Sequence, residues 1–163
     1  MSIPLLVSHV FHLNSQRFFA QAKGLMFDIR ADQDVVIKEI GFFSNVVGNG
    51  IVEVYWRQGS YRGFELSSSG WDLAYERDTD YYNREKLGVL DGLEIPIPEG
   101  STVGFFIFMQ IDKIRYENTE ASSTAVGDNN IQILDGVGVN YSTKWVGNDS
   151  NLFLSRAFRG NIM

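Results

Sequence analysis

Cysteine is absent from this chain, and histidine and proline are scarce, with two and three residues among 163. The lack of cysteine excludes a disulfide framework, a thiol nucleophile and a thiolate metal site, and it leaves the redox compartment open. The two histidines, His9 and His12, are three residues apart, a spacing that points them to opposite faces of a strand. A metal site built on both is therefore not expected.

Basic residues are also few, since the chain has 14 Lys and Arg against 20 Asp and Glu, and its formal net charge is −6. Affinity for nucleic acid rests largely on Lys and Arg that neutralise phosphates, and binding to anionic membranes needs the same residues. No apolar run approaches the length that spans a bilayer. The composition therefore predicts no nucleic-acid partner and no membrane insertion.

Residues 1–13 are rich in apolar side chains but lack a basic first region and a small-residue cleavage site. They predict an amphipathic first strand rather than a signal peptide. The sequence alone thus shows no address for export, and it leaves an intracellular or organellar location open.

Short runs in which every second residue is apolar predict half-buried strands. At Val52–Arg57, the alternation points Val52, Val54 and Trp56 inward and their neighbours outward. At Trp71–Glu76, it points every second side chain inward in the same way. The inward set there is Trp71, Leu73 and Tyr75.

Two further runs fix the place of their strands in the fold. Leu93–Ile97 alternates, but Pro96 cannot donate to a ladder, so this strand belongs at an edge or its end. Val103–Met109 is apolar at almost every position, which predicts a central strand covered on both faces or one whose outer face meets a partner. The predicted core comprises Phe27, Ile29, Ile40, Phe42, Val54, Trp56, Phe105, Ile107 and Ile133.

Turn residues separate these runs at short intervals, with 16 glycines in the chain. Two polar stretches, Arg77–Leu87 and Asn118–Asn130, are predicted to be surface loops. About nine or ten strands at this spacing predict an all-β fold, a single antiparallel β-sandwich of 163 residues.

Four segments give this prediction a more specific form. They are GLMFDIRA (24–31), VEVYWRQGSYRGFE (52–65), NNIQILDGVG (129–138) and LSRAFRGNI (154–162). In this order they resemble the small jelly-roll-like modules, similar to carbohydrate-binding modules, that are repeated in large secreted and cell-surface proteins, chiefly bacterial. The resemblance covers most of the chain, with residues 1–22 as an N-terminal strand and lead-in and residues 23–163 as the module. It implies a jelly-roll-like β-sandwich, an extracellular or cell-surface location, and a binding or adhesive role.

Evidence for catalysis is absent from the sequence, because no G-x-S-x-G pattern accompanies the serines and the plentiful carboxylates of an acidic chain usually form a solvated face. We expect neither an enzyme nor an organic cofactor. Carbohydrate-binding modules of this kind often carry a structural calcium ion, and the resemblance points to Asp28 and Asp128 as its ligands.

Aromatic residues outside the predicted core are the candidates for binding. Placed in turns and polar loops, such rings stack on sugars or anchor protein interfaces, unless they merely cap the ends of the sandwich. We predict a non-catalytic recognition module for a glycan or a protein. The alternatives are a structural subunit or homo-oligomer that uses the apolar outer face of Val103–Met109, and, less favoured, a glycan-processing enzyme. The candidate rings are Tyr61, Phe64, Tyr81, Tyr82, Tyr141 and Trp145.

Overall fold

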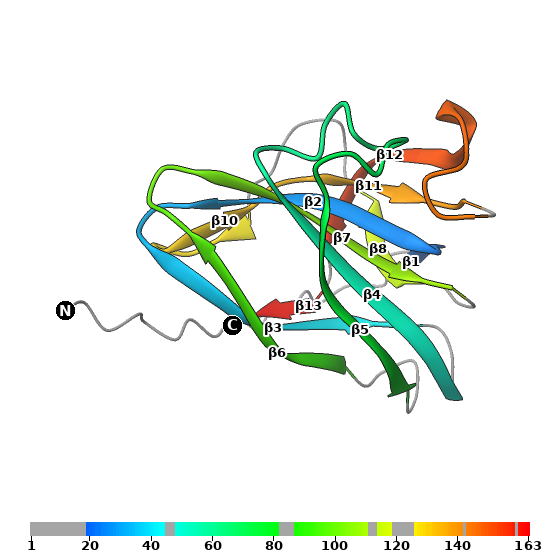
Figure 1. Ribbon diagram of the computed structural model, residues 1–163, viewed down its shortest axis with the longest axis horizontal. Coiled ribbons are helices and arrows are strands. Elements are labelled where there is room, and N and C mark those ends of the chain that lie inside the picture. The colour runs from blue at the N-terminus through cyan, green and yellow to red at the C-terminus, as the bar shows by residue number, and fades with distance from the viewer. Residues whose placement is uncertain are drawn as a thin grey trace.

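The computed structural model describes residues 19–44, 48–81, 87–110, 114–118, 126–141, 143–158 and 160–163. In these ranges the chain forms thirteen strands and one 3-10 helix, η1 (Asp149–Asn151) (Figure 1). The strands are β1 (Phe19–Ala22), β2 (Gly24–Ala31), β3 (Val35–Phe43), β4 (Gly48–Gln58), β5 (Asp72–Tyr81), β6 (Leu87–Ile97), β7 (Thr102–Met109), β8 (Ile114–Asn118), β9 (Val126–Gly127), β10 (Ile131–Ile133), β11 (Gly136–Val139), β12 (Leu152–Phe158) and β13 (Gly160–Ile162).

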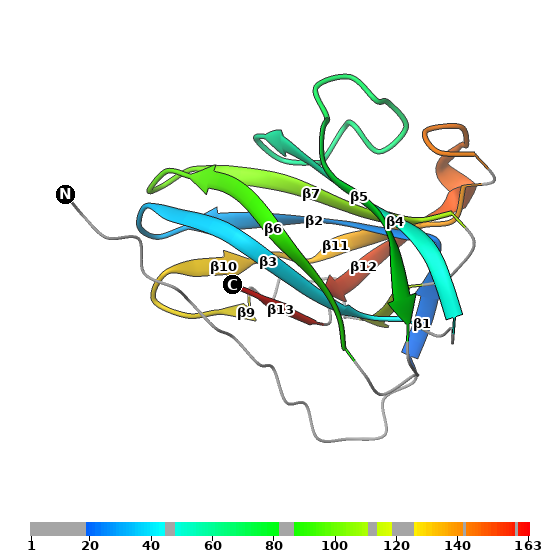
Figure 2. The same cartoon turned by 60° about the horizontal axis from the view of Figure 1, so that its bottom comes forward.

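Two antiparallel sheets form the two layers of a β-sandwich (Figure 2). The larger sheet has the order β1-β8-β12-β11-β2-β7-β4-β5, and β10 also pairs with β2 and carries β9. The smaller sheet has the order β13-β3-β6. The predicted all-β, jelly-roll-like sandwich is confirmed. The strand number exceeds the expected nine or ten, since several strands are only two to four residues long.

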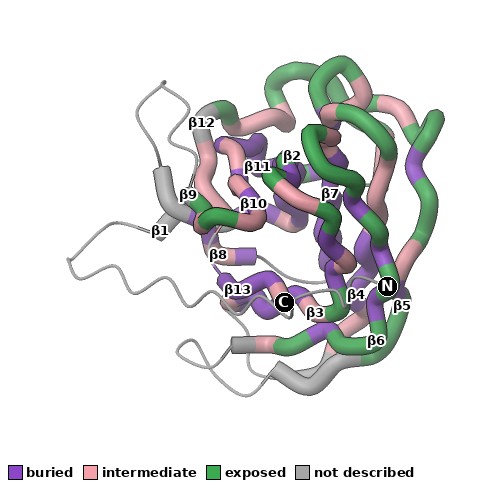
Figure 3. Tube along the Cα trace, turned by 90° about the vertical axis from the view of Figure 1, so that its left-hand side faces the viewer, coloured by how far each residue is buried: buried purple, intermediate pink, exposed green. Residues whose placement is uncertain are grey.

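Apolar side chains fill the space between the sheets, and we call this set the inner cluster. Alternation on each strand sends every second side chain into it, which buries apolar area and gives most of the driving force for folding. Figure 3 shows buried positions on β2 and β7 and on the smaller sheet opposite them. Its members include Phe27, Ile29, Ile40, Phe42, Val54, Tyr75, Leu90, Ile97, Phe105, Ile107, Met109 and Ile133.

The predicted core is confirmed almost throughout. Trp56 is the exception, because it packs against the inner cluster but is only partly buried. Pro96 lies in β6, which is an edge strand of the smaller sheet in the described part of the chain, as expected. The central position of β7 between β2 and β4 is also confirmed.

Three predictions at and around β5 are wrong. Trp71 was expected to face inward, yet it is buried on the outer face of the larger sheet, away from the inner cluster. Leu73 was expected to face inward, yet it is 50% exposed. The cause is a β-bulge: Val54 pairs with Tyr75 but the next residue, Tyr55, pairs with Leu73, so Ala74 is an extra residue and the alternation changes face. The polar stretch expected to be a loop from Arg77 instead continues β5 as far as Tyr81.

Candidate functional site

The outer face of the larger sheet, turned away from the smaller sheet, carries a second set of aromatic residues. Antiparallel register places side chains of β2, β7 and β4 in rows across this face. The rows are Asp28 with Gly104 and Arg57; Met26 with Phe106 and Tyr55; and Gly24 with Phe108 and Glu53. Such a row would be exposed to water if nothing covered it.

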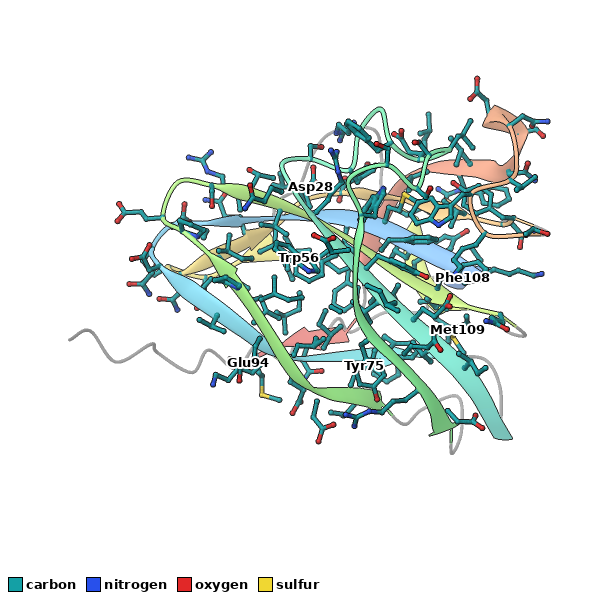
Figure 4. All side chains as sticks on the ribbon, in the orientation of Figure 1. Asp28, Trp56, Tyr75, Glu94, Phe108 and Met109 are labelled. Atoms are coloured by element: carbon teal, nitrogen blue, oxygen red, sulfur yellow. The ribbon has the colours of Figure 1, made fainter. Side chains whose placement is uncertain are left out.

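Two connections fold back over this face, residues 59–71 between β4 and β5 and residues 140–151 between β11 and β12 (Figure 1). Figure 4 shows Asp28 and Phe108 on this side of the sheet, and Tyr75 and Met109 on the side that faces the smaller sheet. The covered side chains, which we call the outer cluster, are Met26, Tyr61, Trp71, Phe106, Phe108, Val137, Val139 and Tyr141, with Tyr55, Phe64, Trp145 and Leu152 partly buried against them.

The turn that begins at Gly59 is attached directly to the sheet. Backbone hydrogen bonds join Gly59 to β7, from Gly59 N to Thr102 O (2.9 Å) and from Gly104 N to Gly59 O (2.8 Å). Gly104 permits this close approach, because a Cβ atom there would lie 2.8 Å from the backbone nitrogen of Tyr61. The Gly-Ser-Tyr signature of the sequence is therefore a docked turn.

A buried carboxylate completes the attachment of this turn. Asp28, 3% exposed, accepts hydrogen bonds from Ser60 Oγ (2.6 Å) and from the Tyr61 backbone nitrogen (2.9 Å), one at each oxygen. Burial raises the pKa of the Asp28 carboxyl, and these hydrogen bonds and the charges of Arg62 and Arg57 oppose the rise. Donors that point at both oxygens, with two guanidinium groups nearby, do not fit a calcium ligand.

Asp128 lies at a different place, in the turn between β9 and β10. Its Oδ1 accepts hydrogen bonds from the backbone nitrogens of Asn130 (2.7 Å) and Ile131 (2.9 Å), so the carboxylate organises its own turn. Within the described ranges, no group of three or more His, Asp or Glu is placed to hold a metal ion. Calcium binding at Asp128 stays a prediction from the resemblance.

Trp145 occupies an unusual backbone position at the rim of the outer cluster. Its φ is +65°, in the left-handed region, which costs a bulky residue roughly 1–3 kcal/mol and is found chiefly where function or packing demands it. The indole centroid lies 4.9 Å from that of Phe106, 5.6 Å from Trp71 and 5.7 Å from Tyr55. Trp145 is only partly buried against the outer cluster.

Next to Trp145, Lys144 reaches down to the sheet. Its Nζ lies 2.6 Å from the Glu53 carboxylate and donates a hydrogen bond to Tyr55 Oη. It also lies 4.8 Å from the ring centroid of Tyr55. Burial lowers the pKa of the Lys144 ammonium, but the hydrogen bonds to Glu53 and Tyr55 outweigh this and raise it overall.

A second cation sits on the other side of the site. The guanidinium carbon of Arg57 lies 3.3 Å from the ring centroid of Phe64, a close cation–π contact, and Arg57 also donates a hydrogen bond to Ser60 O. The Arg57 side chain thus fixes Phe64 and the turn together. Arg57 therefore covers one face of the Phe64 ring, and Lys144 covers one face of the Tyr55 ring.

The structure corrects the expected exposure of two candidate rings. Tyr61 and Tyr141 are 3% and 0% exposed, because Asp28 and Gly104 dock one turn and the Tyr141 hydroxyl donates to Glu65 O in the other connection. Burial raises the pKa of Tyr61 to about 12 and that of Tyr141 further still. Tyr61 and Tyr141 therefore lie buried under the exposed residues and do not form the surface of the site.

The remaining candidates fall into two groups. Phe64 and Trp145 lie at the partly exposed rim, as the sequence predicted. Tyr81 belongs to β5, and the structure describes its backbone only. Tyr82 lies outside the described residues, as do His9 and His12.

Sequence reasoning missed Tyr55, Glu53 and Leu73 as parts of the site. The signal for Tyr55 and Glu53 was present, because the alternation at 52–57 already points both outward next to a central strand that is apolar on its outer face. Leu73 could not be found in this way, since its face depends on the bulge opposite Tyr55.

The exposed part of this face is made of aromatic and aliphatic side chains around one ammonium group. Burial raises the pKa of the Tyr55 hydroxyl, whose oxygen accepts the hydrogen bond from the Lys144 ammonium. Apolar groups surround them, since Leu73 is 50% exposed beside Tyr55 and Val146 is 60% exposed beside Trp145. We call Tyr55, Phe64, Leu73, Trp145 and Val146 the outer site.

Across the described ranges, the structure has no helix long and apolar enough to cross a membrane. No protein-family model matches the chain, and no curated protein matches it either.

Proposed function

We propose that the protein is a non-catalytic recognition module that binds a protein partner at the outer site. The observation that carries this proposal is the rim residue Trp145, which keeps a costly left-handed backbone conformation and yet leaves part of its indole exposed. A large ring in a solvent-facing position stabilises an interface when a partner covers it.

The surroundings of Trp145 favour a protein over a glycan as the partner. Sugar sites usually present a free, flat ring face, but Tyr55 and Trp145 meet edge to face at 77°, and a cation lies over one face of Tyr55 and of Phe64. The exposed neighbours are aliphatic, namely Leu73 and Val146. Aliphatic and aromatic side chains with a charged rim are typical of a protein interface.

A structural subunit that uses the outer face of β7 receives less support. That alternative needs the face to be free, whereas Phe106 and Phe108 are 0% and 4% exposed under the two connections of this same chain. An assembly contact would have to use another surface.

A display library of random peptides and a glycan array test the proposal together. The wild-type protein is compared with Trp145→Ala and Leu73→Ser, and Val89→Ser on β6 is the matched control because Val89 is 44% exposed on the smaller sheet. We expect peptides that bind wild type and the control alike, and bind both site variants about tenfold more weakly, near 1.4 kcal/mol.

Other outcomes decide the remaining alternatives. Glycans that bind in place of peptides, and that lose affinity in the same two variants, would keep the outer site but make its ligand a sugar. Ligands of either kind that bind the site variants as well as wild type would overturn the outer site as the recognition surface.

A further inference from the structure

The turn that carries Trp145 has a backbone geometry for which tryptophan is poorly suited. Val146 N donates to Thr143 O over 3.0 Å, so Lys144 and Trp145 are the two central residues of a tight turn. The second of them has a φ of +65°, a value that usually selects glycine or asparagine at this position. Some other interaction must therefore hold the turn in this form.

An ion pair between Lys144 and Glu53 joins this turn to the larger sheet. Lys144 is the other central residue of the turn, and its ammonium lies 2.6 Å from a carboxylate on β4 whose side chain is 4% exposed. The same ammonium bonds Tyr55 and lies 5.9 Å from the ring centroid of Phe108. Three residues of the larger sheet thus contact the Lys144 ammonium, and they restrain the adjacent residue Trp145 together with it.

The burial of this pair indicates a positioning role rather than a stabilising one. Removing two charges from water costs about as much free energy as their attraction returns, so replacing a buried pair by apolar residues is often neutral or stabilising for the fold. An exposed pair on the smaller sheet, Lys38 with Glu94, differs in this respect, since its side chains are 47% and 70% exposed (Figure 4 labels Glu94).

We infer that Lys144 and Glu53 position Trp145, holding its indole against Phe106 and Tyr55 so that the outer site is formed before a partner arrives. Without the pair, the turn relaxes to an ordinary backbone conformation and the indole leaves the outer cluster for part of the time. The apparent affinity is then reduced to the fraction of time that the indole is in place. This inference rests on the proposed function for its effect on binding, but not for its effect on Trp145.

Fluorine NMR of protein labelled with 5-fluorotryptophan measures the position of the indole directly. The chain has three tryptophans, and a Trp145→Phe sample assigns the resonance of interest. In Lys144→Met and in Glu53→Gln we expect the Trp145 resonance to move toward its unfolded position, with the other two resonances little changed. Each single change leaves one partner without its counter-charge and lowers the melting temperature, so the spectra are recorded well below that temperature. The double variant, which removes both charges, should show the same shift. Lys144→Arg should restore most of the wild-type spectrum, because it keeps the charge.

The matched control is Lys38→Met, which breaks the exposed pair with Glu94 and should leave the Trp145 resonance in place. A Trp145 resonance that is unmoved in Lys144→Met, or that moves only when the whole protein unfolds, would overturn the inference. Peptides selected on wild type should bind Lys144→Met about tenfold more weakly, near 1.4 kcal/mol. If the resonance moves while peptide affinity stays the same, the positioning role stands and the proposed binding function fails.

Discussion

The inner and outer clusters are two apolar cores that share one sheet but are built by different means. The inner cluster takes its side chains from strands of both sheets, and its members are all apolar or aromatic. The outer cluster takes Tyr61, Trp71 and Tyr141 from two connections and places the buried carboxylates of Asp28 and Glu53 beside them. One core is closed by regular pairing, and the other by loops held through specific polar contacts.

On the function proposed above, this difference separates the residues that stabilise the fold from those that bind the partner. Burial between two sheets needs no particular loop, so the inner cluster gives most of the free energy of folding. A core closed by loops leaves a rim, and the partly exposed rings Tyr55, Phe64 and Trp145 lie there. Loops supported by a rigid scaffold are the usual place for binding residues.

The largest expected effect belongs to the inner cluster. Phe105→Ala removes a ring that is 0% exposed and stacks on Phe27 at 5.8 Å, and it should lower the free energy of unfolding by about 3–5 kcal/mol. Urea denaturation followed by far-UV circular dichroism measures this loss. If Trp145→Ala cost as much in the same assay, the proposed division between a stabilising core and a functional rim would be wrong.

The next effect tests how the first connection is attached. Gly104→Ala places a Cβ atom 2.8 Å from Tyr61 N and should lower the free energy of unfolding by roughly 1–3 kcal/mol as the turn is pushed off β7. Near-UV circular dichroism should change with it. Gly88→Ala is the control, because its Cβ would meet only ordinary contacts of 3.6 Å or more. Equal effects of the two changes would show that the turn is not docked on Gly104.

A smaller effect concerns the carboxylate under that turn. Burial raises the folded-state pKa of Asp28 above its ordinary 3.8, so ionising this carboxyl costs free energy in the folded protein. The contribution of Asp28 to stability therefore declines as the pH rises from the ordinary pKa through the raised one. Asp28→Asn keeps a hydrogen-bonding group beside Ser60 and Tyr61 and loses this pH dependence.

The stability difference between Asp28→Asn and wild type should therefore shift in favour of the variant between pH 3 and pH 7. Urea denaturation at several pH values measures it. A shift in the opposite direction would mean that the charged carboxylate stabilises the turn. Addition of calcium should change the midpoints of wild type and Asp28→Asn alike if Asp28 serves only the turn.

The smallest stability effect is expected at the outer site itself. Leu73→Ser alters a side chain that is 50% exposed, so the free energy of unfolding should change by no more than about 0.5 kcal/mol. The melting temperature and the peptide affinity of Leu73→Ser are each compared with those of wild type. A large drop in melting temperature would place Leu73 in a core rather than at a binding surface.

The sequence predicts the inner cluster well because alternation is a local signal. Val52 and Val54 lie where their period-two pattern places them. The pattern fails at Leu73, because a bulge is set by the pairing of two strands and leaves no mark in either strand alone.

The outer cluster is less accessible to sequence reasoning. Tyr61 and Tyr141 appear exposed in a linear reading because they lie among turn residues, and only the docking of the turns on Asp28, Gly104 and Glu65 buries them. The left-handed backbone of Trp145 has no sequence signal either, since that conformation normally accompanies glycine.

Strand β7 has a consequence for the order in which the molecule opens. Phe105 and Ile107 face the inner cluster, and Phe106 and Phe108 face the outer cluster, so the centre of the strand is packed on both sides. Local opening of the two connections would expose only one side of this strand. Backbone amides of β7 should therefore exchange with deuterium last, through global unfolding alone, while those of residues 59–71 exchange through a cheaper local opening. The chain can then loosen the loops that carry the outer site without approaching the unfolded state.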